Sequence, residues 1–318
     1  MHRVVIVGYG EMFTNLIAAA LDANCKIVGV LRRDTLKYPR FIKKLKDIFN
    51  PSKEYSYIKS YNLSEIQAKG VNTEEFRKIL LKLNPDIILV GSWPEKFAKE
   101  TYNIPKIATI NAHPSLLPKY RGPNPYFWVI KNKETVSGIT FHLMDEGFDE
   151  GAILAQEEVK IYPSDTGETL KQRTVLAARG VACELLKALE EDIIIPLKQQ
   201  DEKSSYFSHP EGLELDFKNS AEDNYALIRA IYPWDETYFY HKFTALTPIC
   251  SSVYIEENKT HHKEAGTVVQ LDSKNKTLGI LCGCGKVLKM KVDLYNRQDR
   301  PFTQNYLLLE VREGQVLF

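Results

Sequence analysis

The chain has 318 residues, of which 44% are apolar and 26% charged, and its formal net charge is +1. That length exceeds what one hydrophobic core usually needs, so two domains are expected. The near-neutral charge excludes a protein that binds polyanions over its whole surface. Five scattered cysteines favour a reducing compartment. No apolar run reaches the length of a membrane span, and a strand-like segment follows Met1 directly, so we expect a cytoplasmic protein without a membrane partner.

The first part of the chain predicts a strand, a helix and a second strand in succession. A β-branched run covers residues 4–10, apolar residues at helical spacing cover 12–23, and a second buried run covers 26–31. Such a unit implies a parallel sheet. Gly8 and Gly10 are interpreted as turn residues, because Phe13 stands where a dinucleotide-binding fingerprint has its third glycine.

The alternation of strands and helices continues to about residue 196. Further strands are expected at 86–92, 106–111, 137–144 and 152–161, and helices at 73–83 and 125–132. Asp165, three residues before Glu168, predicts a capping box that opens a long amphipathic helix. The buried stripe of that helix is expected to contain Leu170, Val175, Leu176, Val181, Leu185, Leu186 and Leu189. These elements predict an α/β domain with a Rossmann-like, mostly parallel sheet and flanking helices.

The pattern of polar and apolar residues changes after Pro196. Residues 197–212 are polar and rich in turn residues, which is typical of a linker. A helix at 221–232 and strands at 265–272, 277–283 and 286–294 follow, and they predict a small antiparallel, OB-like barrel or sandwich. We place the first domain at 1–203, linker included, and the second at 204–318. Cys282 and Cys284 are interpreted as part of a tight hairpin, and no metal is expected there, because no second ligand pair stands at zinc spacing.

Asn111 and His113 stand together at the end of an apolar strand and are followed by a loop rich in proline. Parallel sheets bind ligands at the carboxyl ends of their strands, and residues two apart share one side of a strand. A third polar group, Asp149, comes from an acidic, glycine-containing loop, whereas His142 is interpreted as structural. An amide and a protonated imidazole can stabilise an oxyanion, and a carboxylate favours the imidazolium and helps to take a proton. The three residues therefore predict acyl transfer to an amine without a covalent enzyme intermediate.

The stretches 110–125 and 137–154 together resemble the folate-dependent formyltransferase family, which uses 10-formyltetrahydrofolate. The shared features are the Asn-x-His pair at 111–113, the Ser-Leu-Leu-Pro run at 115–118, and Asp149 in its acidic loop. Residues 224–234 and 265–290 are similar to the carboxy-terminal barrel of methionyl-tRNA formyltransferases and of some sugar formyltransferases. The resemblance implies that Asn111, His113 and Asp149 are catalytic and that the formyl donor is 10-formyltetrahydrofolate.

The resemblance also implies a set of binding residues. The residues expected to contact the folate donor are Ile88, Leu89, Val90, Gly91, Trp93, Ser115, Leu116, Leu117, Pro118, Met144, Asp145 and Gly147. The residues expected to contact the acceptor substrate are Arg32, Arg33, Arg121, Gly122, Tyr126 and Trp128.

The acceptor amine remains open between two classes. Initiator methionyl-tRNA is favoured by the barrel-like second domain and by residues 32–59, which hold nine basic and three acidic residues. An amino-sugar nucleotide is favoured by the aromatic run 126–128 and by the second domain, where 13 basic residues meet 15 acidic ones. A third hypothesis, a binding protein with a degenerate site, is disfavoured because the three catalytic residues are all present.

Overall fold

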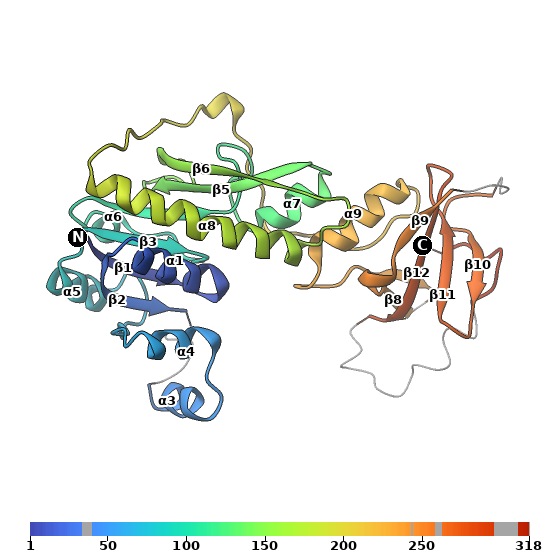
Figure 1. The fold of residues 1–318 in the computed structure, drawn as a ribbon. Helices are drawn as coiled ribbons and strands as arrows, with labels where there is room; N and C mark the ends of the chain where they lie inside the picture. Colours follow the sequence, from blue (N-terminus) through green and yellow to red (C-terminus); the bar gives the residue numbers. More distant parts are fainter. Residues whose placement is uncertain (34–39, 243, 258–262, 296–310, 318) are drawn as a thin grey trace. The chain divides into compact units, whose positions relative to one another are not determined.

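A computed structural model describes residues 1–33, 40–242, 244–257, 263–295 and 311–317 (Figure 1). The chain forms two compact units. The first unit consists of Met1–Pro125, Val136–Lys160 and Lys171–Ser208, and the second of Tyr126–Thr135, Ile161–Leu170 and His209–Phe318. Two short segments, 126–135 and 161–170, thus belong to the second unit, although the chain on either side of each belongs to the first unit.

The first unit is built on a six-stranded sheet with the strand order β2-β1-β3-β4-β5-β6. The strands are β1 (Arg3–Gly8), β2 (Lys26–Arg32), β3 (Ile87–Gly91), β4 (Ala108–His113), β5 (Val136–Leu143) and β6 (Ile153–Lys160). Strands β1 to β4 are parallel, whereas β5 and β6 are antiparallel to their neighbours. The expected mostly parallel sheet is confirmed.

Helices cover both faces of this sheet (Figure 1). The helices are α1 (Gly10–Asp22), α3 (Arg40–Phe49), α4 (Lys53–Ser60), α5 (Glu74–Leu83), α6 (Lys99–Tyr102) and α8 (Gly167–Glu190). One core cluster joins α1, α8 and Ile58 of α4 to the sheet. A second cluster joins Phe76 and Leu80 of α5 to the opposite face, through alternate residues of the same strands.

Two details of α8 differ from the expectation. Because the helix begins at Gly167, Thr166 occupies the capping position, and the N–H of Thr169 donates to its hydroxyl over 3.3 Å. The N–H of Thr166 donates in return to Thr169 Oγ1 over 2.9 Å, so the reciprocal cap lies one residue beyond the predicted Asp165. The prediction for Leu176 was also wrong: its side chain is 68% exposed, because the buried stripe continues from Val175 through Ala178 and Ala182.

The second unit contains α7 (Pro125–Lys131), α9 (Ala221–Ile231) and a curled antiparallel sheet. Its strands are β7 (Phe239–His241), β8 (Thr244–Pro248), β9 (Tyr254–Glu256), β10 (Val268–Asp272), β11 (Thr277–Leu281) and β12 (Val287–Leu294). The Cys282–Gly285 turn joins β11 to β12 as an antiparallel hairpin, with Gly285 at φ 83°. The predicted small β-rich domain is confirmed. Within the described residues, no helix has both the length and the apolarity that a bilayer crossing requires.

Candidate active site at the end of strand β4

The three residues predicted to be catalytic lie together. Asn111 and His113 end β4, and Asp149 lies in the loop between β5 and β6. Asp149 Oδ1 lies 3.4 Å from Asn111 Nδ2, and its Oδ2 lies 3.4 Å from His113 Nδ1. The two-residue repeat of the strand sends both side chains of β4 to one side of the sheet, where a single carboxylate contacts both.

The His113 ring has an acceptor at each nitrogen. Its Nε2 lies 2.8 Å from the carbonyl oxygen of Tyr120, and its Nδ1 faces Asp149. Burial lowers the pKa of His113, while the negative charge of Asp149 and the Tyr120 carbonyl act against that decrease. Only the doubly protonated ring donates to both acceptors at once. The geometry thus favours the imidazolium form, whereas the dry surroundings oppose it.

Asp149 is ionised over a wide pH range. Burial raises the pKa of this carboxyl group, but His113, His142 and the N–H of Gly122 together hold it well below its usual value. The Gly122 N–H donates to Oδ2 over 3.0 Å. The backbone of Asp149 has φ 58°, in the left-handed region that few residues other than glycine adopt. A charged group in a sparsely populated backbone conformation therefore lies at the centre of the site.

His142 belongs to the same cluster, although the sequence indicated a structural role. It pairs with Asn111 across β4 and β5, and its Nε2 lies 3.1 Å from Asn111 Nδ2 and 3.5 Å from Asp149 Oδ1. Its Nδ1–H donates to the carbonyl of Leu143 over 2.9 Å, which leaves Nε2 as an acceptor for the amide. The signal that could have found it is the antiparallel register between the two strands. The alternation of polar and apolar residues within each strand does not determine which residues of the two strands lie opposite each other.

Arg121 and Gly122 support the loop and do not project from it. Arg121 is 7% exposed, and its guanidinium donates to Gln199 Oε1 over 3.1 and 2.8 Å. A Cβ atom on Gly122 would lie 2.3 Å from the carbonyl oxygen of Phe207. The structure therefore gives both residues protein partners around Asp149, and the substrate contact expected of them stays a prediction.

The expected donor-binding residues fall into two groups. Ile88, Leu89 and Val90 are at most 1% exposed, because β3 pairs with β1 on one side and β4 on the other. The other expected residues that are fully buried are Gly91, Ser115 and Leu117. These six are buried in the structure, and their expected contact with the donor stays a prediction. The residues that keep exposed or partly exposed surface are Trp93, Leu116, Pro118, Met144, Asp145 and Gly147.

Trp93 gives an independent indication of a ligand near the end of β3. Its indole N–H is buried and has no hydrogen-bond acceptor within the described part of the chain. A buried donor without an acceptor is costly, and a bound polar group removes that cost. The amide of Asn111 and the imidazole of His113, which do lie together, are also hydrogen-bond donors, as a formyl oxygen requires.

The other residues expected to contact the acceptor substrate differ in exposure, and their substrate contacts stay predictions. Arg32 is 2% exposed and its guanidinium forms ion pairs with Asp47 and Glu65, so it is a structural residue. Arg33 remains partly exposed, with its guanidinium 5.1 Å from the centre of the Tyr9 ring. In the second unit, Tyr126 is 9% exposed and stacks on Trp234, and Trp128 lies under the ammonium of Lys131. The aromatic residues Tyr126 and Trp128 thus contact other side chains of the same unit.

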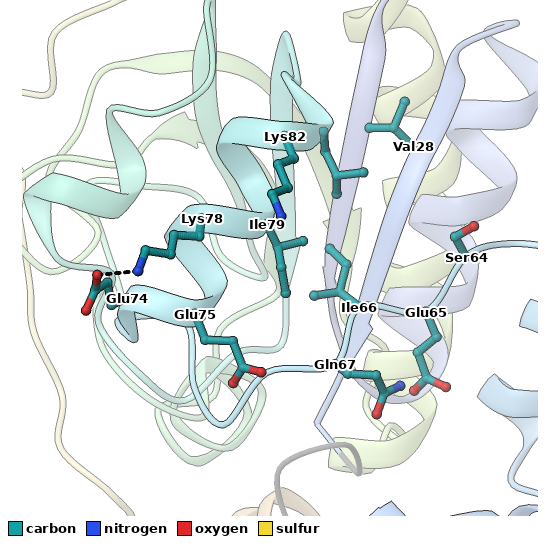
Figure 2. A pocket seen from close by; sticks show the side chains of 11 residues that line it. Val28, Ser64, Glu65, Ile66, Gln67, Glu74, Glu75, Lys78, Ile79 and Lys82 are labelled. Atoms are coloured by element: carbon teal, nitrogen blue, oxygen red, sulfur yellow. Dashed lines mark ion pairs between the residues drawn. The ribbon is translucent and has the colours of Figure 1, made fainter.

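A groove of about 700 Å³ lies elsewhere on the first unit (Figure 2). It is lined by Val28 of β2, by residues 64–67 and by the side of α5 that carries Ile79 and Lys82, with the ion pair between Glu74 and Lys78 at its rim. None of the three predicted catalytic residues lines it. Size alone therefore does not identify the reactive centre, which is defined by the convergence of titratable groups.

Comparison with known proteins agrees with this site and fold. Residues 2–184 match the formyl transferase family and residues 208–298 match the formyl transferase C-terminal domain. The chain belongs to the formyl transferase family, and it is an enzyme that transfers formyl groups. The methionyl-tRNA formyltransferase of Lachnospira eligens is 31% identical over 93% of both chains, and that of Clostridium novyi is 32% identical over 89% of both.

Two solved structures share the fold at lower identity. The sugar 3N-formyltransferase WlaRD has a TM-score of 0.63 at 19% identity, covering 92% of this chain and 98% of its own. The N-formyltransferase of Helicobacter canadensis, solved with folinic acid and dTDP-3-aminofucose, has a TM-score of 0.64 at 17% identity, covering 92% and 100%. At these identities the likeness concerns the fold alone.

Proposed function

We propose that this formyltransferase moves a formyl group from 10-formyltetrahydrofolate to the amino group of initiator methionyl-tRNA. The observation that carries the chemistry is the convergence of Asn111, His113 and Asp149 within 3.4 Å contacts at the carboxyl end of β4. Support for the acceptor comes from relatives named methionyl-tRNA formyltransferase that align over nearly the whole chain.

In the proposed mechanism the protein acts by hydrogen bonding and proton handling. The acceptor amine attacks the formyl carbon, and Asn111 Nδ2 and the Nδ1–H of His113 donate to the oxyanion that develops. The Nε2 of His113 keeps its 2.8 Å contact with the Tyr120 carbonyl, whereas Nδ1 has only a 3.4 Å contact with Asp149. To reach it, the Asn111 amide keeps its hydrogen bond to His142 and gives up its longer, 3.4 Å contact with Asp149. Asp149 favours the protonated ring against the effect of burial, which lowers the His113 pKa. It also takes part in removing the amine proton, which is delivered to the departing folate nitrogen as its bond to the formyl carbon breaks.

The donor is proposed to contact the surface-reaching members of the expected set, namely Trp93, Leu116, Pro118, Met144, Asp145 and Gly147. Support comes from the buried Trp93 N–H without an acceptor in the described residues. We assign the reaction to residues 1–203 and a supporting role in acceptor binding to 204–318. The proposed location is the cytoplasm, where aminoacylated tRNA and folate co-substrates meet.

An amino-sugar nucleotide is the alternative acceptor. The aromatic run at 126–128 favours it on sequence grounds. The stacking of Tyr126 on Trp234, with 9% of Tyr126 exposed, leaves that ring little surface to offer a ligand. The structure thus weakens the feature on which the alternative rests, and tRNA stays the preferred acceptor.

The test is direct transfer of radiolabelled formyl. Purified protein is offered 10-formyltetrahydrofolate with initiator methionyl-tRNA or with a panel of dTDP- and UDP-linked amino sugars, and His113→Ala serves as the catalytic control. We expect labelled tRNA from the unaltered protein and a loss on the order of 100- to 1000-fold in the variant. Transfer to a sugar nucleotide alone would reassign the acceptor. Transfer to none of them would favour a binding protein.

A further inference from the structure

The segment 199–207, which the sequence indicates as a linker, is bound along the loop that follows β4. The N–H of Arg121 donates to Ser205 O over 2.8 Å, and the N–H of Ser205 donates to Pro118 O over 3.2 Å. The hydroxyl of Ser205 accepts the N–H of Tyr120 over 2.9 Å. The Tyr120 ring stacks on Phe207 with centroids 5.1 Å apart and planes 13° apart. The returning chain is therefore paired with the loop as an added strand would be.

Gln199 connects this segment to Asp149. Its side chain is 5% exposed, and Nε2 donates to the carbonyl oxygens of Asp149 and Gly151, each over 2.8 Å. Its Oε1 accepts from Arg121 Nε and Nη2, which determines the orientation of the amide. Both amide hydrogens and the amide oxygen are thus used. A residue bound in this way acts as a rigid spacer between Arg121 and the backbone of Asp149.

The backbone that Gln199 holds has an uncommon conformation. Asp149 has φ 58°, a conformation that side-chain-bearing residues keep only where surrounding contacts impose it. The carboxylate direction depends on that conformation, and the contacts to His113 and Asn111 depend on the carboxylate. On the other side, Ser205 holds Tyr120, whose carbonyl accepts from His113 Nε2 over 2.8 Å.

We propose that residues 199–207 are a positioning element of the active site. In it, Gln199 holds Asp149, and Ser205 holds Tyr120, whose carbonyl oxygen accepts a hydrogen bond from His113. The proposal rests on the catalytic roles proposed above for these residues. It makes Gln199 and Ser205 positioning residues: Gln199 acts through Asp149, and Ser205 acts through Tyr120 on His113.

Gln199→Glu tests the proposal with a minimal change. The carboxylate still accepts from Arg121 but cannot donate to the carbonyls of Asp149 and Gly151. Gln200→Glu is the matched control, because it makes the same change at the next residue, whose side chain is exposed. We expect Gln199→Glu to lower kcat about 10- to 100-fold, since a misplacement of about 1 Å costs on that order, with KM for the donor within about twofold. The control is expected to match the unaltered enzyme.

A readout beyond activity separates positioning from general damage. The His113 imidazole titration, followed by NMR, is expected to move to lower pH in Gln199→Met, which adds no charge near the ring, because a displaced Asp149 opposes the effect of burial less. Ser205→Ala is a further variant, expected to lower kcat, with Ser205→Thr restoring it through the retained hydroxyl. Thermal unfolding checks that the variants are folded.

The outcomes are distinguishable. Unaltered kcat in both Gln199→Glu and Ser205→Ala, together with an unaltered His113 titration in Gln199→Met, would overturn the positioning role, even if Asp149→Asn abolished transfer. If the parent enzyme transferred formyl to no acceptor, the proposed function would be wrong. The NMR titration would then still test, without any activity, whether Gln199 holds the pair of Asp149 and His113.

Discussion

Asp149 is the residue on which the charge state of the site depends. Its carboxylate contacts His113, His142 and the N–H of Gly122, and these partners outweigh the effect of burial on its own pKa. For His113 burial prevails and the pKa is lowered. The carboxylate shift is caused by His113 and the Gly122 N–H that face it, whereas the imidazole shift is caused by lost hydration and a second histidine nearby.

Asp149→Asn is expected to lower the pKa of His113 further, because the charge that opposes the burial effect is removed. The unfolded chain binds a proton at His113 below a pH of about 6.5, where the folded ring resists it. Stability therefore falls as pH drops below that value, and the decline should extend to lower pH in the variant. NMR titration of His113 and urea unfolding between pH 7 and 4 measure both effects. A His113 pKa that stays or rises in Asp149→Asn would contradict the assignment.

His142→Phe is expected to lower kcat about tenfold by removing the acceptor that orients the Asn111 amide, a smaller loss than that of a direct oxyanion donor. His142→Gln retains an acceptor and is expected to recover part of the rate. Steady-state kinetics with donor and acceptor varied in turn measure both variants. Equal rates in the two variants would show that the hydrogen bond to Asn111 is not what matters at this position.

At the scale of elements, the end of β2 is tied to the following helices by a buried charge cluster. Arg32, which is 2% exposed, forms ion pairs with Asp47 of α3 and with Glu65, and its guanidinium lies 5.1 Å from the centre of the Tyr55 ring. Breaking a buried pair by removing one partner is costly because the remaining charge is left without compensation. The cluster therefore anchors α3 and α4 to the edge of the sheet.

Arg32→Met is expected to lower the free energy of unfolding by about 3–5 kcal/mol. Arg33→Met, at the next and partly exposed position, is expected to cost less than about 1 kcal/mol. Urea unfolding measures the contrast. A stable Arg32→Met variant with a raised KM for the acceptor would instead restore the substrate-binding role that the burial of Arg32 argues against.

Helix α8 allows the same substitution to be compared at a buried and an exposed position. Leu185 is 3% exposed and belongs to the core cluster under the sheet, whereas Leu176 is 68% exposed. Leu185→Ala is expected to cost about 2–5 kcal/mol through lost burial and a residual cavity. Leu176→Ala is expected to stay within about 0.5 kcal/mol. Denaturant unfolding followed by circular dichroism checks this, and similar losses in both would mean that the helix is rotated from the described position.

At the scale of the whole molecule, charge is distributed unevenly along a chain with a net charge of only +1. Residues 32–59 hold nine basic residues against three acidic ones, whereas residues from 204 onward hold 13 against 15. Part of the basic segment, residues 34–39, lies outside the described residues. A nucleic-acid contact would therefore be local, and its strength would depend on salt.

If tRNA is the acceptor, its KM should rise steeply with salt. Each neutralised phosphate changes log K by about 0.7–0.9 per unit of log salt, so four contacts weaken binding on the order of 100-fold between 50 and 200 mM salt. An amino-sugar nucleotide, with two phosphates, should change much less. Transfer kinetics over that range, with the donor saturating, measure the slope. A flat profile for tRNA would argue against phosphate contacts as the source of acceptor affinity.

By itself the sequence determined the alternation of strands and helices, the β-rich second part, and the placing of Asn111 and His113 on one side of a strand end. These follow from local periodicity and from one recognisable combination of motifs, and both are readable within short windows. Only the tertiary structure brought His142 opposite Asn111, buried Arg32 against partners 15 and 33 residues away, and returned Gln199 to a carbonyl 50 residues earlier. Strand register, burial and the path of a returning chain are long-range properties, because they depend on which distant groups compensate a charge or accept a hydrogen bond.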